Sequence, residues 1–170
     1  HRDLHSFPTR RSSDLRFPFD ILLTQIKKSR EDVFLKMGIT NLHFHLRTKT
    51  LEGTQVFGYK RLLLQAFNGL INNAIQANPD GGQIKILGKK TKKWIEIRIK
   101  DTGVGIPPAI QGELFKGIIK NGKNGMGIDC MIIATIIKYH CGQIMIEKPG
   151  PRDTTILIRF PLSDASPIAE

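Results

Sequence analysis

Hydrophobic residues recur at two different spacings along the chain, and each spacing predicts a different element. In residues 19–37 apolar positions such as Leu22, Ile26 and Phe34 follow the 3.6-residue period, which is typical of an amphipathic helix. Gly38 is a suitable end for that helix. Residues 39–47 instead alternate apolar with polar positions, which indicates a half-buried strand.

The rest of the chain repeats these two patterns, separated by turn residues. Residues 48–58 form a polar connection, residues 60–77 a second helix, and residues 78–82 a strong turn signal. The remaining elements are strands at 83–87 and 94–100, a glycine-rich loop at 112–127, a helix at 127–140 and a closing hairpin of 143–147 with 154–160. This order predicts a single α/β domain built as a two-layer sandwich.

Residues 1–15 show neither period and do not resemble protein sequence. They resemble the translation of an adapter oligonucleotide used in short-read sequencing, so we predict a non-native, disordered segment outside the core. A basic natural tail is the alternative, and it too would lie outside the core. On the adapter interpretation, whatever preceded Arg16 is missing. The domain then covers residues 16–163, and residues 164–170 are a C-terminal tail.

Composition and charge narrow the class of partner. Hydrophobic residues make up 40% and charged residues 24% of the chain, as in ordinary soluble domains, and no apolar run approaches the roughly 18 residues of a membrane span. The formal net charge of +11 fits nucleic acid, anionic lipid or a polyanionic small ligand. The densest basic run, residues 89–93, lies between two predicted strands, which favours a solvated hairpin. The sequence lacks the interleaved aromatic residues of a base-stacking surface, so we expect no nucleic acid partner.

Four segments carry the candidate chemistry. They are QAFNGLINNAIQA at 65–77, DTGVGIP at 101–107, KNGMGI at 123–128 and GPRDTTILIRFPL at 150–162. In this order they resemble the N, G1, G2 and G3 boxes of the Bergerat-fold ATPases, and their spacing is most similar to the sensor histidine kinase branch. The resemblance covers nearly all of residues 16–163. It implies a mixed sheet covered on one face by about three helices, and ATP with Mg²⁺ as cofactors.

The G1 segment has a physical reason for each of its residues. Asp101 follows a strand and can accept a hydrogen bond from the exocyclic amino group of adenine, so adenine is favoured over guanine. Gly103 and Gly105 are expected to turn the backbone at positive φ and to let it approach the ring. A glycine-rich turn without function is the alternative for this segment taken alone.

The N-box helix supplies the metal ligand that the resemblance implies. Asn73 occupies the position whose amide oxygen binds Mg²⁺ in the family, and we assign it the catalytic and metal-binding role. Asn72 is expected at the surface. The family has another Asn where this chain has Gly69, and Asn68 is one residue early. We therefore expect Gly69→Asn to raise the rate of phosphoryl transfer and also to stabilise the helix, because glycine costs about 1 kcal/mol relative to alanine.

The phosphate side of the site rests on the G2 segment. Backbone N–H groups at Gly125 and Gly127 would face phosphate at a helix N-terminus. Lys123 is either a phosphate contact or a solvated loop lysine, and Phe115 is either a lid hinge or a core anchor. Thr155, placed as the G3 threonine, would meet adenine through water, or it is a surface residue of the strand. The expected nucleotide-binding set is Asn73, Ala77, Asp101, Gly103, Gly105, Ile106, Phe115, Lys123, Gly125, Met126, Gly127 and Thr155.

Other reactive side chains have simpler interpretations. His43 and His45 are not expected to accept phosphate, because they lie in an alternating strand pattern and the motif around them departs from the phosphoacceptor sequence of the family. Cys130 falls in an apolar helical stretch, so a buried free thiol is favoured over a redox role.

The resemblance implies a bacterial two-component histidine kinase domain in the cytoplasm. Closure of the 112–127 lid over Mg-ATP would precede transfer of the γ-phosphoryl group to a histidine on a missing upstream dimerisation domain. Such a parent protein would be a homodimer that can be anchored in the inner membrane, with a response regulator as downstream partner. The alternatives are an anti-sigma-type serine kinase or other ATPase of the superfamily, and a non-catalytic ATP-sensing module.

Overall fold

A five-stranded mixed sheet forms one layer of the structure, a computed structural model that describes residues 16–116 and 126–162. Its strands are β2 (Leu42–Arg47), β4 (Gly82–Lys90), β5 (Trp94–Asp101), β6 (Gln143–Pro149) and β7 (Thr154–Pro161), in the spatial order β2-β4-β5-β7-β6. Strand β2 runs parallel to β4, and the other neighbours are antiparallel. The sheet is therefore mixed, as expected.

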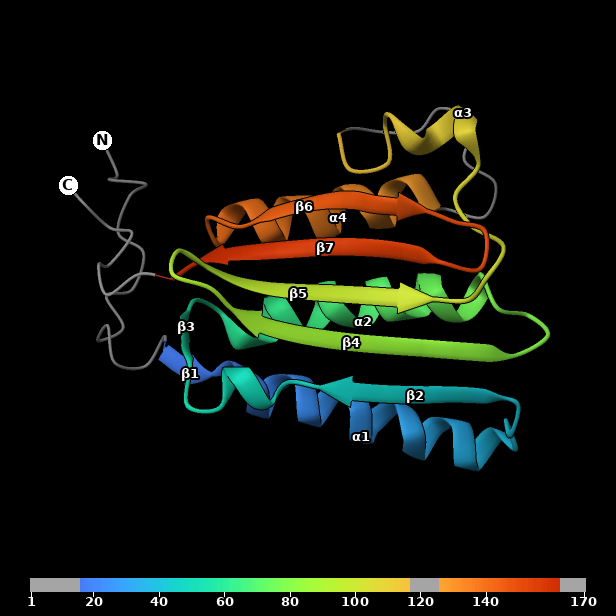
Figure 1. The fold of residues 1–170 in the computed structure, drawn as a ribbon, viewed down its shortest axis with the longest axis horizontal. Helices are drawn as coiled ribbons and strands as arrows, with labels where there is room; N and C mark the ends of the chain where they lie inside the picture. Colours follow the sequence, from blue (N-terminus) through green and yellow to red (C-terminus); the bar gives the residue numbers. More distant parts are fainter. Residues whose placement is uncertain (1–15, 117–125, 163–170) are drawn as a thin grey trace, which may run out of the picture.

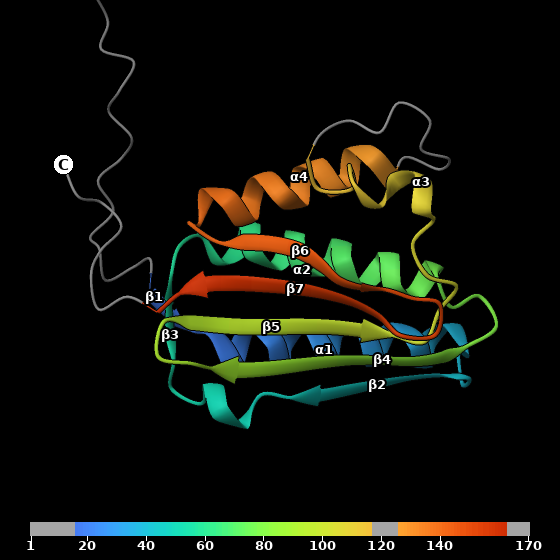
Figure 2. The same cartoon turned by 45° about the horizontal axis from the view of Figure 1, so that its top comes forward.

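Helices α1 (Phe19–Met37), α2 (Lys60–Gln76) and α4 (Met126–Tyr139) cover one face of this sheet (Figures 1 and 2). The predicted two-layer α/β sandwich is confirmed. Within residues 16–116 and 126–162, no helix is long and apolar enough to cross a membrane.

The shortest elements were not predicted. These are the pair of strands β1 (Arg16–Pro18) and β3 (Gln55–Phe57), the 3₁₀ helix η2 (Lys49–Leu51) and helix α3 (Pro108–Gln111). Each spans only three or four residues, which is too few to show a period in the sequence.

The core lies between the sheet and the three helices. On β5 the side chains of Ile95, Ile97 and Ile99 alternate toward the helices and are at most 2% exposed. Phe19, at the start of α1, packs edge-on against Phe67 of α2 and Phe160 of β7, with ring centroids 5.6 and 5.5 Å apart. This aromatic contact holds both layers together at one end of the core.

Helices α2 and α4 pack antiparallel, and Gly69 lies where they approach each other. A Cβ atom at Gly69 would lie 2.9 Å from Cδ1 and 3.3 Å from Cγ1 of Ile133 on α4, a side chain that is 3% exposed. Asn68 faces helix α1 instead, where its Oδ1 accepts hydrogen bonds from Arg30 at 2.9 and 3.2 Å. This contact opposes the stabilisation expected for Gly69→Asn, because the gain in helix propensity would be offset by crowding of Ile133.

His140 connects the end of α4 to the start of α2. Its Nε2 accepts a hydrogen bond from the backbone N–H of Tyr59 at 2.9 Å, while its Nδ1 lies 2.7 Å from the carbonyl of Ile136. Both bonds form together only in the neutral tautomer with the proton on Nδ1. Burial lowers the pKa of His140 from its ordinary value, and the bond to Ile136 partly opposes that effect.

Substitution of Gly69 by Asn should lower the free energy of unfolding by about 1–2 kcal/mol. Overpacking costs about 1–3 kcal/mol, and helix propensity returns only a few tenths of that. Urea denaturation measures the change. The matched partner is Ile133→Val, which removes the Cδ1 atom that residue 69 would meet. The two substitutions together should cost less than the sum of their separate costs, and additive costs would show that the helices do not meet there.

The stability that His140 contributes should fall as the pH decreases. Its folded pKa lies below the unfolded value of about 6.5, so the unfolded chain takes up the proton first and the free energy of unfolding drops below about pH 6.5. Urea denaturation at about pH 8 and about pH 5 compares the wild type with His140→Gln, which should depend less on pH. Exposed His45→Gln is the control and should behave like the wild type. Equal pH dependence in all three proteins would contradict this role.

Candidate functional site

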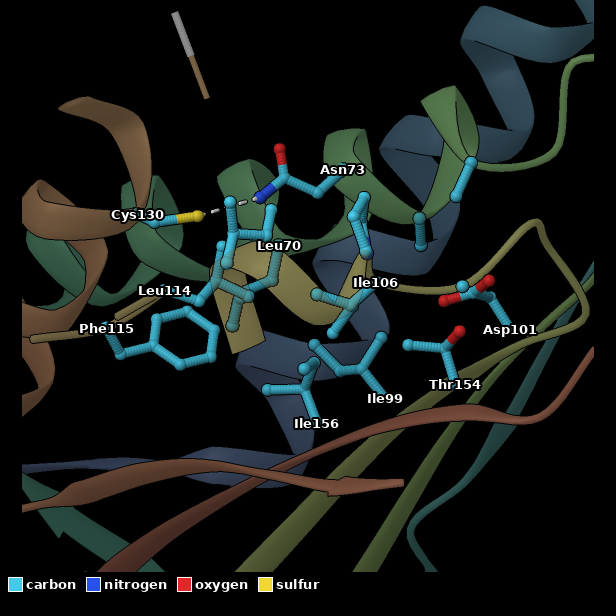
Figure 3. Close-up of a pocket in the computed structure, with 15 residues that line it drawn as sticks. Leu70, Asn73, Ile99, Asp101, Ile106, Leu114, Phe115, Cys130, Thr154 and Ile156 are labelled. Carbon is cyan, nitrogen blue, oxygen red and sulfur yellow. Dashed lines mark hydrogen bonds between the residues drawn. The ribbon is translucent and has the colours of Figure 1, made fainter. Parts of the chain in front are cut away.

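A largely apolar pocket lies between helix α2, the ends of β5 and β7, and the segment that follows β5 (Figure 3). Its apolar walls come from Leu70, Ala74, Ala77, Ile99, Ile106, Pro107, Ile110, Leu114, Phe115 and Ile156. Its polar side chains are Asn73, Asp101 and Thr154, with the thiol of Cys130. An apolar slot with few polar groups is suited to a flat heteroaromatic ring.

Asp101 closes one end of the pocket. It continues the helix-facing alternation of β5 and is 7% exposed. Its Oδ1 accepts hydrogen bonds from the backbone N–H of Gly103 at 2.8 Å and from Nδ2 of Asn78 at 3.3 Å, while Oδ2 accepts none from the described residues. Burial raises the pKa of Asp101 above its ordinary value, and these two bonds partly oppose the rise. One carboxylate oxygen is thus held in place and the other is left for a ligand.

Asn78 positions this carboxylate, a role that the sequence did not reveal. Besides Asp101, its Nδ2 donates to the carbonyl of Ala74 at 2.7 Å, and its Oδ1 accepts from the hydroxyl of Thr102 at 3.1 Å. The side chain is 6% exposed, so these bonds replace hydration that it has lost. In the sequence, Asn78 reads only as a turn residue. The available signal was a polar side chain directly after the helix C-cap Ala77, where it can bond to the last turn.

Thr154, rather than Thr155, faces the pocket. Thr154 pairs with Asp101 in the antiparallel register, is 5% exposed, and its Oγ1 has no hydrogen-bond partner among the described residues (Figure 3). Thr155 lies on the opposite face of β7, where its hydroxyl donates to Asp153 at 3.3 Å. The prediction of Thr155 is corrected because side chains alternate along a strand. Counting back in twos from the buried Phe160 selects Thr154.

Asn73 lies on the same wall as Cys130. Its Nδ2 is 3.6 Å from the sulfur of Cys130, and its amide oxygen points away from that sulfur (Figure 3). Burial raises the pKa of the Cys130 thiol to about 11, against the opposing bond from Asn73, so the thiol is neutral. The buried free thiol is confirmed. Among the described residues, no group of three or more Asp, Glu, His or Cys side chains is placed to hold a metal ion. A metal ion bound through Asn73 would therefore need oxygens of the ligand as well.

The two glycines of the G1 segment act differently from each other. Gly105 has a φ of 85°, as expected, and the N–H of Ile106 next to it donates to the carbonyl of Pro149 at 2.8 Å. Gly103 does not have positive φ, so that expectation is wrong for it. A side chain at Gly103 would collide with the carbonyl of Ala77, which accepts the N–H of Val104 at 2.9 Å. Gly103 is small because helix α2 ends directly against it.

Six of the predicted binding residues line the one pocket: Asn73, Ala77, Asp101, Gly105, Ile106 and Phe115. Phe115 also packs against the main core and against a second small cluster of Leu114 and Cys130, which fits the anchor interpretation. Its role as a lid hinge stays a prediction. The space left between the walls is about 90 Å³, below the roughly 300–1,000 Å³ of most ligand pockets. A nucleotide would therefore displace neighbouring side chains.

Of the residues predicted on the phosphate side, Lys123 and Gly125 lie outside the described residues, and Met126 and Gly127 begin α4.

The fold and the pocket together define an α/β nucleotide-binding domain. The family described as "Histidine kinase-, DNA gyrase B-, and HSP90-like ATPase" matches residues 58–164, which is more than half of the chain. The chain belongs to this family of ATPases, and ATP is the nucleotide that the family implies for the pocket.

Several bacterial sensor kinases are similar to the chain. Sporulation kinase A of Bacillus subtilis (strain 168) is 30% identical over 110 residues, which are 65% of this chain and 18% of the relative. The sensor-like histidine kinase SenX3 of Mycobacterium tuberculosis (strain ATCC 25618 / H37Rv) is 30% identical over 129 residues, 72% of this chain and 32% of the relative. The chain thus spans less than a third of the relative's length in the first case and about a third in the second.

Solved structures share the fold. The catalytic domain of the histidine kinase ThkA aligns with a TM-score of 0.73 and 22% identity, covering 86% of this chain and 94% of that one. Full-length ShkA in complex with AMPPNP aligns with a TM-score of 0.71 and 14% identity, covering 89% of this chain and 32% of that one.

Substitution of Thr154 by Val should weaken ATP binding by about 1–2 kcal/mol without destabilising the protein. The change keeps the shape of the side chain and removes a hydroxyl that has no described protein partner, so only contacts to a ligand or its water are lost. Calorimetric titration measures the affinity, and urea denaturation measures the stability. Thr155→Val is the matched control on the opposite face and should bind ATP like the wild type. A larger effect at Thr155 than at Thr154 would restore the original assignment.

Proposed function

We propose that this chain is the ATP-binding catalytic domain of a bacterial two-component sensor histidine kinase. The observation that carries the proposal is the pair of polar groups at the closed end of an apolar slot, the Oδ2 of Asp101 and the orphan hydroxyl of Thr154. These groups match an adenine edge, which presents an amino donor. The sensor kinases among the relatives support the kinase branch of the family.

The chain binds and orients the nucleotide through two sets of groups. The adenine ring lies between the apolar walls, with its amino group donating to Asp101 and its solvent-side atoms near Thr154. The phosphates extend past Asn73 toward the N-terminus of α4, whose backbone dipole favours negative charge. Asn73 supplies one amide oxygen to Mg²⁺, which neutralises charge on the phosphate oxygens. The roles of Lys123, Gly125, Met126 and Gly127 on the phosphate side remain predictions.

In the parent protein the acceptor is a histidine on an upstream dimerisation domain. Its imidazole nitrogen attacks the γ-phosphorus in line, a new N–P bond forms, and the bond to the bridging oxygen breaks, so ADP leaves. The imidazole gives up a proton in the process. We propose that this parent is a homodimer that can be anchored in the inner membrane, holds this domain in the cytoplasm, and passes phosphate to a response regulator. The structure of ThkA in complex with the response regulator protein TrrA belongs to a protein of the same fold.

One observation favours a second candidate, a non-catalytic ATP-sensing module. Gly69 replaces the Asn that the family has in its N box, and Asn68 cannot substitute for it because Arg30 engages its oxygen at 2.9 Å. Such a module would bind ATP through the same pocket without transferring phosphate.

Asp101→Asn should lower the affinity for ATP by about 1–3 kcal/mol, because an amide can present a donor where the adenine amino group needs an acceptor. The wild-type chain should also bind ATP more tightly than GTP, since guanine places a carbonyl oxygen opposite the carboxylate. Calorimetry with both nucleotides and both proteins measures these differences. Asp80→Asn, at an exposed turn, is the control. Equal affinity of the wild type for ATP and GTP would contradict the assignment of Asp101.

A phosphorylation assay on the full-length protein distinguishes a histidine kinase from a serine kinase and from a non-catalytic ATP-sensing module. Incubation with γ-labelled ATP should give a phosphorylated protein whose label is lost in acid and kept in alkali, as expected for phosphohistidine. Acid-stable label would indicate a serine kinase. ATP binding without any label would support the sensing module instead.

A further inference from the structure

The sheet face opposite the helices has one half whose charges are paired. On β5, β6 and β7, Arg98 contacts Glu147 at 2.9 Å and Glu96 at 3.1 Å, and Arg159 contacts Glu96 at 3.0 Å. This part of the face therefore holds cations and carboxylates together and has little charge left for a partner.

The other half of the same face is hollow and basic. A hollow of about 350 Å³ is lined by His45, Arg47, Gln83, Lys85, Leu87 and Lys100. An adjoining hollow of about 160 Å³ shares Gln83, Lys85 and Lys100 and adds Asp101, Thr102, Arg152 and Asp153, of which Asp101 also lines the nucleotide pocket. We call these two hollows the basic groove; its cations are Arg47, Lys85, Lys100 and Arg152. It runs across β2, β4 and β5, on the face turned toward the viewer in Figure 1.

Most charges of the basic groove have no local partner. Lys100 contacts Asp153 at 3.3 Å, but Asp153 is shared with Lys148 at 2.7 Å. Arg47, Lys85 and Arg152 form no ion pair with any residue in the part of the chain that the structure describes. The concave shape gathers these positive charges on one surface, which suits an anionic ligand.

The strand register of β4 and β5 brings two like charges together, which lowers the stability of the sheet. Lys85 and Lys100 are directly opposed in the antiparallel pair of β4 and β5. Like charges at such positions repel each other and destabilise a sheet. A local feature that opposes folding is most often found where a protein binds something. An anion placed between the two ammonium groups would turn the repulsion into attraction.

The layout of the groove selects the class of anion. Arg47, Lys85 and Lys100 lie on three neighbouring strands roughly 4.8 Å apart, and Arg152 lies in the loop before β7. Because these cations do not converge on one point, they suit several separate negative groups. The lining has no Phe, Tyr or Trp on which bases would stack, which disfavours nucleic acid. Carboxylates on one side of an acidic polypeptide recur about 5–7 Å apart. We propose that the basic groove binds an acidic segment of a partner protein, on the face of the sheet opposite the helices and the nucleotide pocket.

A labelled octaglutamate peptide is the probe, with fluorescence anisotropy as the readout. The wild-type chain should bind it, and the affinity should fall as salt rises, because exposed ion pairs are screened. Lys85→Glu should weaken binding by about tenfold. The control is Lys92→Glu, an exposed position in the turn between β4 and β5 with the same change in net charge, which should alter binding less than about twofold.

Further measurements on the same proteins test this proposal. Lys85→Glu should raise the melting temperature, because it places a carboxylate opposite Lys100, so lost binding cannot be ascribed to unfolding. Its ATP affinity, measured by calorimetry, should be unchanged, and excess ADP should not displace the peptide. No peptide binding, equal weakening by Lys92→Glu, displacement by ADP, or tighter binding of a DNA oligonucleotide of equal charge would each overturn the proposal. Apart from displacement by ADP, these outcomes do not test the nucleotide site.

Discussion

The contact between the end of helix α2 and the turn after β5 is the constraint on which the pocket depends. The carbonyl of Ala77 accepts the N–H of Val104 at 2.9 Å, and Gly103 leaves room for that approach. Asn78 extends the contact by bonding to Asp101 from the same end of the helix. Because Asn73 and Ala77 come from the helix and Asp101 from the strand, any change in this contact would separate the two walls of the site.

The closed end of the pocket holds two buried polar groups whose hydrogen bonds are incomplete among the described residues. A buried polar group without a partner costs about 1–3 kcal/mol, so most proteins avoid it. Among the described residues, nevertheless, the hydroxyl of Thr154 has no hydrogen-bond partner, and one oxygen of Asp101 has no donor. Both lie at one end of a slot whose remaining walls are apolar. This closed end of the pocket is organised before the ligand arrives, which reduces the cost of ordering it on binding, although the side chains around the rest of the pocket must move.

The two faces of the sheet serve different physical purposes. The face toward the helices is filled by isoleucine and phenylalanine side chains and carries the closed end of the nucleotide pocket. The opposite face is polar, and its charges are balanced on β5, β6 and β7 but not on β2 and β4. Part of the excess positive charge of the chain is therefore concentrated in one groove, which the net charge of +11 by itself did not reveal.

The sequence by itself determined the main helices and strands, the α/β class and the positions of Asn73 and Asp101. These features follow from periods of 3.6 and 2 residues and from short motifs, because local sterics decide which side chains share a face. Tertiary structure decided the rest. The strand register placed Thr154 in the pocket in place of Thr155, and the closeness of α2 and α4 left no free space at Gly69. Register and helix spacing depend on contacts between residues far apart in the chain, and a one-residue shift reverses the face of every side chain on a strand.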